Sequence, residues 1–345
     1  MKAAARFAFV AALLPLIVWW SLALYLRLQL PGPPWMPAAA AVAYAVGTLA
    51  LLVLVRPLRR ALAVFAAVFA ALLFWWSGIE PSNDRDWLPD VAQIPSGDLR
   101  GDLLALRNVR NFDYRSETDF VPRYEERTYD LSRLVGIDMF LSYWGSPYIA
   151  HTIVSWEFDD GQHLAVSIET RKEKGEEYSA LRGFFREYEL CYVAADERDV
   201  VRLRTDYRGE QVYLYRLAVP VERARAALLD YVQAMNRLAA RPQFYNALTD
   251  NCTTTIQMHN RHVNPNAAFD WRIVVNGYLD QLMYERGTAD RSLPFAELRA
   301  RSLIDERARA ADAASDFSAR IREGLPPRPV PRAAPEGSAA RPREP

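Results

Sequence analysis

The chain has 345 residues, which is enough for a membrane anchor plus one or two ordinary domains. Lysine plus arginine and aspartate plus glutamate number 42 each, so no overall basic charge indicates nucleic acid as a partner. The apolar residues are unevenly distributed, because long uncharged runs are concentrated in about the first eighty residues.

Three uncharged stretches predict membrane-spanning helices, at residues 7–26, 37–55 and 61–79. Each is close to the roughly 20 apolar residues that a helix needs to cross a bilayer. The alternative is a cleaved signal peptide followed by buried helices of a soluble protein. The first stretch is longer than a usual signal-peptide core, and no small-residue cleavage site closes it. We therefore expect an integral membrane protein with a three-helix region over residues 1–79.

The basic residues around these stretches predict their orientation. Five of them lie before the first stretch or between the second and third, against one in the other short loop: Lys2, Arg6, Arg56, Arg59 and Arg60 against Arg27. Short cytoplasmic loops are enriched in lysine and arginine, so the N-terminus is expected in the cytoplasm. Three crossings then place the rest of the chain on the opposite side.

The remaining chain divides by composition into three parts. Residues 80–100 hold three prolines and several turn formers and predict a connector. Residues 101–323 predict one α+β domain, and the tail at 324–345 is rich in Pro, Ala and Arg and predicts disorder. Strand-like runs lie at 103–108, 138–143, 151–158, 162–170, 188–194, 199–204 and 211–218, and helical patterns at 221–239, from about 252, at 276–285 and at 303–323.

The two cysteines lie in very different surroundings. Cys191 lies in the apolar run YELCYVAAD, which is typical of a small buried hydrophobe. Cys252 follows Asp250 and Asn251, either of which is a good helix N-cap, so its sulfur is expected in the first turn of a helix. The free N–H groups and the dipole there favour thiolate, as in cysteine nucleophiles. Asn251 and the backbone N–H of Cys252 are candidates for an oxyanion site. The alternative is a Cys191–Cys252 disulfide.

Two of the four histidines follow Cys252 on the same predicted helix. His259 and His262 form an H-x-x-H pair, which can bind metal, but no further ligand has convincing spacing. We expect them to be surface histidines and predict neither a metal nor any other cofactor, because no nucleotide-binding motif is present.

The other two histidines belong to a predicted β-hairpin, HTIVSWEF-DDG-QHLAVSIET, whose register follows from its apolar faces. Apolar residues occupy even-numbered positions on both strands. Residues that lie opposite each other on the two strands share a face of the sheet, so their residue numbers must add up to an even total. With a two-residue turn at 160–161, the numbers of facing residues add up to 321, which would put the two apolar sets on opposite faces. With a three-residue loop at 159–161 they add up to 320, and Gly161 is the left-handed residue of the loop. That register places His151 opposite Glu169. The hypothesis is that Cys252 is the nucleophile, His151 the base and Glu169 the group that orients His151.

Four segments resemble the Lnb-type periplasmic domain family, which includes lipoprotein intramolecular transacylases. They are NVRNFDYRSETDF, YDLSRLVGIDMFLSYWGSPYIAHTIVSWEF, SIETRKEKGEEYSALRGFFREYEL and YNALTDNCTTTI. The resemblance implies that His151 in YIAHT is the catalytic histidine and Cys252 in DNCTT the catalytic cysteine, with SIETRKE matching around Glu169 and Arg171. It also implies a bacterial protein of the inner (cytoplasmic) membrane with a periplasmic catalytic domain.

The chain order of the two catalytic residues is similar to that of circularly permuted papain-like enzymes, because the histidine precedes the cysteine. The expected fold is therefore α+β: three transmembrane helices followed by a permuted papain-like (NlpC-like) extracytoplasmic domain. Arg171 and Arg182 are candidates for binding phosphate or carboxylate head groups. Tyr143, Trp144 and Tyr148 are candidates for an acyl or substrate groove, although packing in the core is equally compatible with the sequence.

The expected function is a membrane-anchored periplasmic thiol acyltransferase, or an acyl hydrolase, that works through a cysteine thioester on a membrane lipid or lipoprotein. One alternative is a cell-wall amidase or peptidase of the papain/NlpC type. Another is a non-enzymatic envelope protein with a Cys191–Cys252 disulfide.

Overall fold

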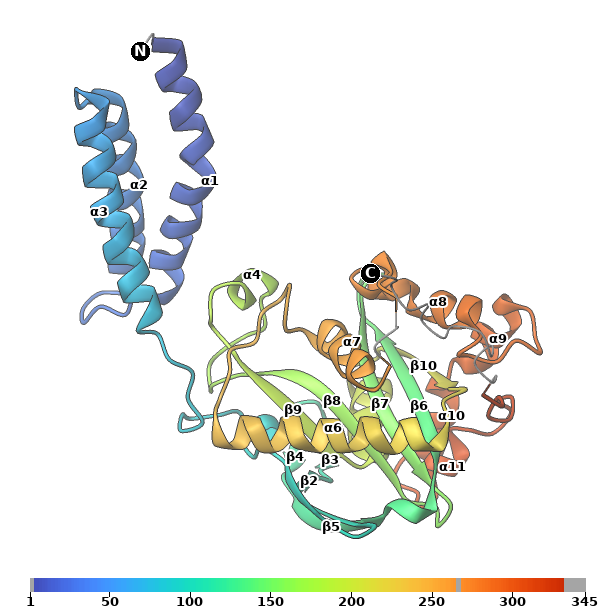
Figure 1. Cartoon of the computed structure of the whole chain (residues 1–345). Coiled ribbons are helices and arrows are strands. Elements are labelled where there is room, and N and C mark those ends of the chain that lie inside the picture. The colour runs from blue at the N-terminus through green and yellow to red at the C-terminus, as the bar shows by residue number, and fades with distance from the viewer. Residues whose placement is uncertain (1–2, 265–267, 332–345) are drawn as a thin grey trace, which may run out of the picture. The chain divides into compact units, whose positions relative to one another are not determined.

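The computed structural model describes residues 3–264 and 268–331, and these residues divide into two compact units. The first comprises residues up to Arg85 together with the segments 172–189 and 242–248. The second comprises residues 86–171, 190–241 and the rest from 249 on. Figure 1 shows the elements of both.

The three helices expected to span a membrane are present in the first unit. They are α1 (Ala3–Arg27), α2 (Met36–Leu54) and α3 (Leu58–Ser77). Each is long and apolar enough to cross a bilayer, which confirms the prediction of three membrane-capable helices. The segment 172–189 carries the short helix α4 (Ala180–Gly183) and belongs to the same unit, where Arg27 pairs with Glu187 at 3.0 Å.

The second unit is built around a large sheet. Among the described residues, eight strands form it: seven in the order β1-β2-β9-β8-β7-β6-β10, with β5 paired to β2. Their bounds are β1 Ser96–Arg100, β2 Leu103–Arg110, β5 Tyr124–Asp130, β6 Leu134–Tyr143, β7 Ala150–Phe158, β8 His163–Arg171, β9 Glu189–Ala195 and β10 Gln211–Arg216. A separate two-stranded ribbon pairs β3 (Asp113–Tyr114) with β4 (Phe120–Val121). β1 begins inside the segment predicted as a connector.

Helices cover both faces of this sheet. The long α6 (Val221–Ala240) crosses one face (Figure 1), where the Trp156 indole N–H donates to Ala224 O at 2.9 Å. Ile153 of β7 and Ala165 of β8 have odd residue numbers, so their side chains lie on the face opposite to that of Trp156. On that face they pack in a core with residues of α10 and α11. The other helices are α5 Glu197–Arg202, α7 Cys252–Val263, α8 Leu279–Arg286, α9 Phe295–Ser302, α10 Asp305–Ala311 and α11 Phe317–Arg320. The α+β class is therefore confirmed.

The β7–β8 hairpin has the predicted register. Trp156 faces Leu164 and Val154 faces Val166, which gives the even sum that the apolar faces required. Gly161 has a φ of +84°, the left-handed conformation expected at the end of the three-residue loop. The alternation of apolar residues thus fixed the side to which every residue of this hairpin points, including His151 and Glu169.

One expected strand is wrong. Residues 199–204 form the end of α5 and the start of a π-helical turn over Leu203–Tyr207. The Asp196 side chain accepts a hydrogen bond from Arg198 N at 2.9 Å and caps this helix. Such a short apolar run fits a helix as well as a strand, and the cap favours the helix.

The C-terminal expectations need two corrections. The helix predicted over 303–323 is two helices, α10 and α11, because Asp312 adopts a positive φ of 39° that ends the first one. The tail predicted to be disordered lies partly outside the described residues, which end at 331. Within its described part, Arg328 pairs with Asp138 at 2.7 Å, so the ordered domain extends beyond residue 323.

Candidate active site

Cys252 is the first residue of α7, as the sequence predicted. The side-chain oxygen of Asn251 accepts hydrogen bonds from Thr253 N and Thr254 N, both at 3.0 Å. The Thr254 hydroxyl accepts in return from Asn251 N at 3.0 Å, which completes a capping box. The sulfur therefore lies at the positive end of a helix dipole, where a thiolate is stabilised. The cap occupies the amide oxygen of Asn251.

His151 and Glu169 lie together at the end of the hairpin. His151 Nε2 is 3.4 Å from Glu169 Oε1, and the Ser167 hydroxyl bridges them with contacts of 2.6 Å to each. Arg204, from the π-helical turn, donates to the same oxygen of Glu169 at 2.9 Å. Nε2 of His151 is thus engaged with the hairpin, which leaves Nδ1 as the ring nitrogen available to Cys252.

The protonation equilibria of His151 and Cys252 are coupled. Burial acts to lower the pKa of His151, but the negative charge of Glu169 outweighs it, with help from the hydrogen bond to Cys252, and raises the pKa to about 9. Burial acts to raise the pKa of the Cys252 thiol, but the hydrogen bond and charge of His151 lower it below its usual value. Both shifts favour a thiolate–imidazolium pair.

Cys191 has none of these features. Its side chain is fully buried in the core, and burial raises the pKa of its thiol to about 12. Both Cys191 and Cys252 are free thiols, so the alternative of a Cys191–Cys252 disulfide is wrong. Cys191 lies on β9 and packs with Ile153 and Ala165, whereas Cys252 is half-buried at a helix start.

Asn276, which the sequence reasoning missed, connects the segments that carry the base and the nucleophile. Its side chain accepts from Ala150 N at 2.8 Å and donates to Ala150 O and to the Thr253 hydroxyl. Ala150 precedes His151 and Thr253 follows Cys252, so one buried amide holds both chains in place. No local signal identifies Asn276, because its contacts come from distant parts of the sequence.

The residues expected to bind substrate are differently placed. Arg171 is buried, its guanidinium donates to Val91 O at 2.9 Å and to Ala92 O at 2.7 Å, and it lies 4.2 Å from the Trp87 ring. Its expected contact with a head group is therefore wrong, because backbone carbonyls and the ring already hold its charge. Arg182 lies in the first unit, pairs with Glu187 at 2.7 Å and stays a prediction.

The three aromatic candidates divide in the same way. Tyr143 is buried, its hydroxyl donates to Gly277 O at 2.9 Å and its ring packs against Tyr213. It is part of the core rather than of a groove. Trp144 and Tyr148 are about half exposed, and a role for them in substrate binding stays a prediction.

An apolar cavity of about 450 Å³ lies beside α7. Thr253 and Ile256, from the first two turns of that helix, line it, so it adjoins the segment that carries Cys252. Its other walls come from β6 and β7, from α6 and from α8, and include Met139, Val154, Ala227, Leu279, Leu282 and Met283. Its volume is in the range of small-molecule sites, which is about 300–1,000 Å³.

The fold and this site define a class: a membrane protein with three apolar helices and a mixed α/β domain in which a histidine–carboxylate pair meets a cysteine at a helix start. Residues 120–277 match the family described as the Lnb N-terminal periplasmic domain. The match includes His151, Glu169, Cys252 and Asn276. No curated protein and no solved structure matches the chain. The family is associated with enzymatic function.

Proposed function

We propose that this protein is a membrane-anchored thiol acyltransferase of the bacterial periplasm, with Cys252 as nucleophile, His151 as base and Glu169 as the residue that orients the base. The observation that carries the proposal is the contact between His151 and Cys252, the first residue of α7, through which each shifts the pKa of the other. Glu169 contacts the other ring nitrogen of His151. The domain has the order of a permuted papain-like enzyme, with the histidine on a strand before the cysteine on a helix.

The reaction has two halves. His151 takes the proton of Cys252, and the thiolate attacks the carbonyl carbon of an ester. The C–S bond forms, the ester C–O bond breaks, and the alcohol leaves with the proton that His151 returns. An amine, or water in a hydrolase, then attacks the thioester and gives its proton to His151. The C–S bond breaks and the thiolate is restored. In this proposal the backbone N–H of Cys252 stabilises the oxyanion of each tetrahedral intermediate.

The apolar cavity favours an acyl chain as the group transferred. Aliphatic and thioether side chains form much of its wall, and Thr253, the residue after Cys252, is one of its lining residues. A cell-wall peptidase built on the same dyad needs a polar groove for a peptide backbone instead. Apolar surface buried in such a cavity contributes about 25 cal/mol per Å² to binding.

The proposed location follows from the membrane helices and the family. The positive-inside rule predicts an N-terminus in the cytoplasm and, after three crossings of helices able to span a membrane, a domain on the periplasmic face of the inner membrane. A substrate that is itself a membrane lipid or a lipoprotein is concentrated there.

The test is mass spectrometry of the intact protein. Full-length protein in detergent is incubated with bacterial lipid extract, and an acyl adduct that hydroxylamine removes at neutral pH is expected on the wild type. Cys252→Ala should carry no adduct, and Cys191→Ala, which removes the buried thiol, should still carry it. Identical adduct levels on the wild type and Cys252→Ala would contradict the proposal.

A further inference from the structure

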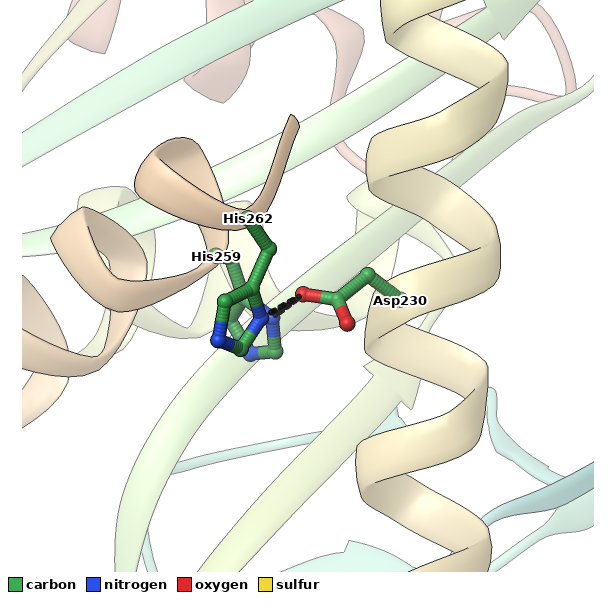
Figure 2. Close-up of side chains that lie close together, drawn as sticks. All are labelled: Asp230, His259 and His262. Carbon is green, nitrogen blue, oxygen red and sulfur yellow. Dashed lines mark hydrogen bonds and ion pairs between the residues drawn. The ribbon is translucent and has the colours of Figure 1, made fainter. Parts of the chain in front are cut away.

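A second cluster of chemically active side chains lies on the same helix as Cys252 but further along it. His259 and His262 are three residues apart on one face of α7, and both point toward Asp230 of α6 (Figure 2). The Nδ1 atom of His259 is 2.6 Å and that of His262 2.8 Å from the same carboxylate oxygen, Oδ2 of Asp230. The three ligand atoms lie within 4.8 Å of one another.

The positions of these side chains differ from the sequence expectation. His259, expected at the surface, is only 1 % exposed. His262 is half exposed, so the cluster has a buried side and an open side. Two α-helices contribute the ligands, so the geometry comes from the packed scaffold rather than from a loop.

A shell of aromatic residues fixes the ring of His259. Its Nε2 atom lies 2.6 Å from the Tyr192 hydroxyl, and the Tyr231 ring stacks on the imidazole with ring centres 3.9 Å apart. A histidine that binds metal through one nitrogen nearly always has a hydrogen-bond partner for the other, which fixes the tautomer. Tyr192 supplies that partner, because its oxygen can accept from Nε2–H when Nδ1 is a ligand.

We propose that Asp230, His259 and His262 bind a divalent transition-metal ion of the zinc type. Two imidazole nitrogens and one carboxylate oxygen are ligands that Zn²⁺ takes readily, and a water on the open side beside His262 completes a tetrahedron. Ligand atoms around Zn²⁺ at about 2.0–2.2 Å lie roughly 3.3 Å apart. The present separations of 2.6 and 2.8 Å need to widen by about half an ångström. A rotation of the exposed His262 and of the carboxylate supplies that movement.

The ion would join α6 to α7. His259 follows Cys252 by two helical turns, or about 10 Å at 1.5 Å per residue, so the thiol is not a ligand of the same ion. The ion would hold the helix whose first turn carries the nucleophile. This inference does not depend on the proposed acyl transfer, because the metal content of the protein can be measured without any substrate.

The test measures metal binding by the full-length protein in detergent, after removal of any affinity tag. Binding of Zn²⁺ is followed by competition with a chromogenic chelator. The wild type should bind close to one equivalent. His262→Ala, which removes an exposed side chain and should leave the fold intact, is expected to weaken binding by at least about a hundredfold, more than the 10–100-fold typical of outer-shell partners. Asp230→Asn should do the same. His163→Ala is the matched control, because it removes a histidine from the far end of the hairpin.

Cobalt provides the second readout. Co²⁺ bound to two imidazoles and a carboxylate in a tetrahedral site gives visible d–d absorption without the near-ultraviolet band of a thiolate ligand. That spectrum should persist in Cys252→Ala and disappear in His262→Ala. The proposal is overturned if the wild type binds no Zn²⁺, if His262→Ala retains wild-type affinity, or if a thiolate band appears that Cys252→Ala abolishes.

Discussion

Oε1 of Glu169 lies 3.4 Å from Nε2 of His151, and the Arg204 guanidinium donates a hydrogen bond to the same carboxylate oxygen at 2.9 Å. Arg204 is 3 % exposed, so the carboxylate lies between a buried guanidinium and the imidazole. Burial acts to raise the pKa of Glu169, but the charges of His151 and Arg204 keep it well below its usual value. The orienting group therefore keeps its negative charge at pH values where an ordinary glutamate is already protonated.

The first prediction concerns that charge. Glu169→Gln keeps the shape but removes the charge that raises the pKa of His151, and the amide also favours the wrong imidazole tautomer. Loss of the orienting carboxylate in a triad costs up to about 10⁴ in kcat, and we expect a fall of at least about a hundredfold here with KM little changed. Steady-state acyl transfer measures it. Glu157→Gln, the same change at the other end of the hairpin, should leave kcat near wild type.

A second prediction concerns the pH dependence of thiol reactivity. The pKa of Cys252 is lowered, so its thiolate forms below the usual range, and the imidazolium of His151 persists until about pH 9. The midpoint of alkylation by iodoacetamide should therefore lie at a lower pH than for an ordinary cysteine, and acyl transfer should fall above about pH 9 as His151 loses the proton needed by the leaving group.

His151→Ala gives the matched comparison for this profile. The substitution removes the contact that lowers the thiol pKa, whereas burial, which raises it, remains. The alkylation midpoint should move to higher pH. Cys191, buried and with a thiol pKa of about 12, should stay unlabelled in the native protein. An unchanged midpoint in His151→Ala would mean that the two residues are not coupled.

A third prediction concerns Asn276, which positions the two catalytic segments. Asn276→Ala leaves the backbone groups of Ala150 and the Thr253 hydroxyl without their partner. Buried unsatisfied groups cost about 1–3 kcal/mol each, so the melting temperature should fall. A positioning role requires more than this: kcat should fall at least about tenfold at temperatures where the variant is fully folded, and the alkylation midpoint of Cys252 should rise.

A fourth prediction concerns the apolar cavity. Ile256→Trp places a larger side chain in the cavity wall, about one helical turn after Cys252. Transfer from long-chain esters should slow at least about tenfold, because the chain loses its site, while short acetyl esters should be affected much less. Met258→Trp, an equally large change on the exposed side of α7, is the control. Equal loss with both chain lengths would argue against an acyl-chain site.

A fifth prediction concerns stability in acid. Glu197 is fully buried and binds Arg322 through two hydrogen bonds of 2.6 and 2.7 Å. Burial acts to raise the pKa of Glu197, but the charge of Arg322 outweighs it and lowers the pKa from 4.5 to about 2. A carboxyl with a lowered folded pKa stabilises fully above its unfolded pKa, and this contribution is lost as the pH falls through the folded value.

The window for this effect is therefore between about pH 4.5 and 2. Glu197→Gln should lower the melting temperature in detergent at pH 6, and the difference from wild type should shrink as the pH falls through that window. Glu126→Gln, on an exposed side chain of β5, should change neither value. A difference that stays constant with pH would show that the loss comes from packing rather than from charge.

The sequence predicted the parts of this site that are set locally. Hairpin register follows from alternating residues a few positions apart, so His151 and Glu169 could be placed opposite each other. The helix start at Cys252 follows from its cap in the same way. The membrane helices follow from length and composition.

The rest of the site comes from long-range packing. Asn276 and Arg204 reach the site from distant segments, and nothing near them in the chain marks them out. Arg171 is two residues from Glu169, yet its guanidinium donates to the backbone carbonyls of Val91 and Ala92. His259 becomes buried only because α6 and the Tyr192 hydroxyl pack around it.

The chain order of the site has a consequence for its biogenesis. The hairpin that carries His151 and Glu169 is local and can form as soon as it has crossed the membrane, whereas Cys252 follows much later and needs the still later Asn276 to be positioned. Until then Cys252 lacks the contact with His151 that lowers its pKa in the folded protein. The reactive nucleophile thus appears only at the end of folding. A nascent chain in an oxidising compartment is thereby protected from premature disulfide exchange.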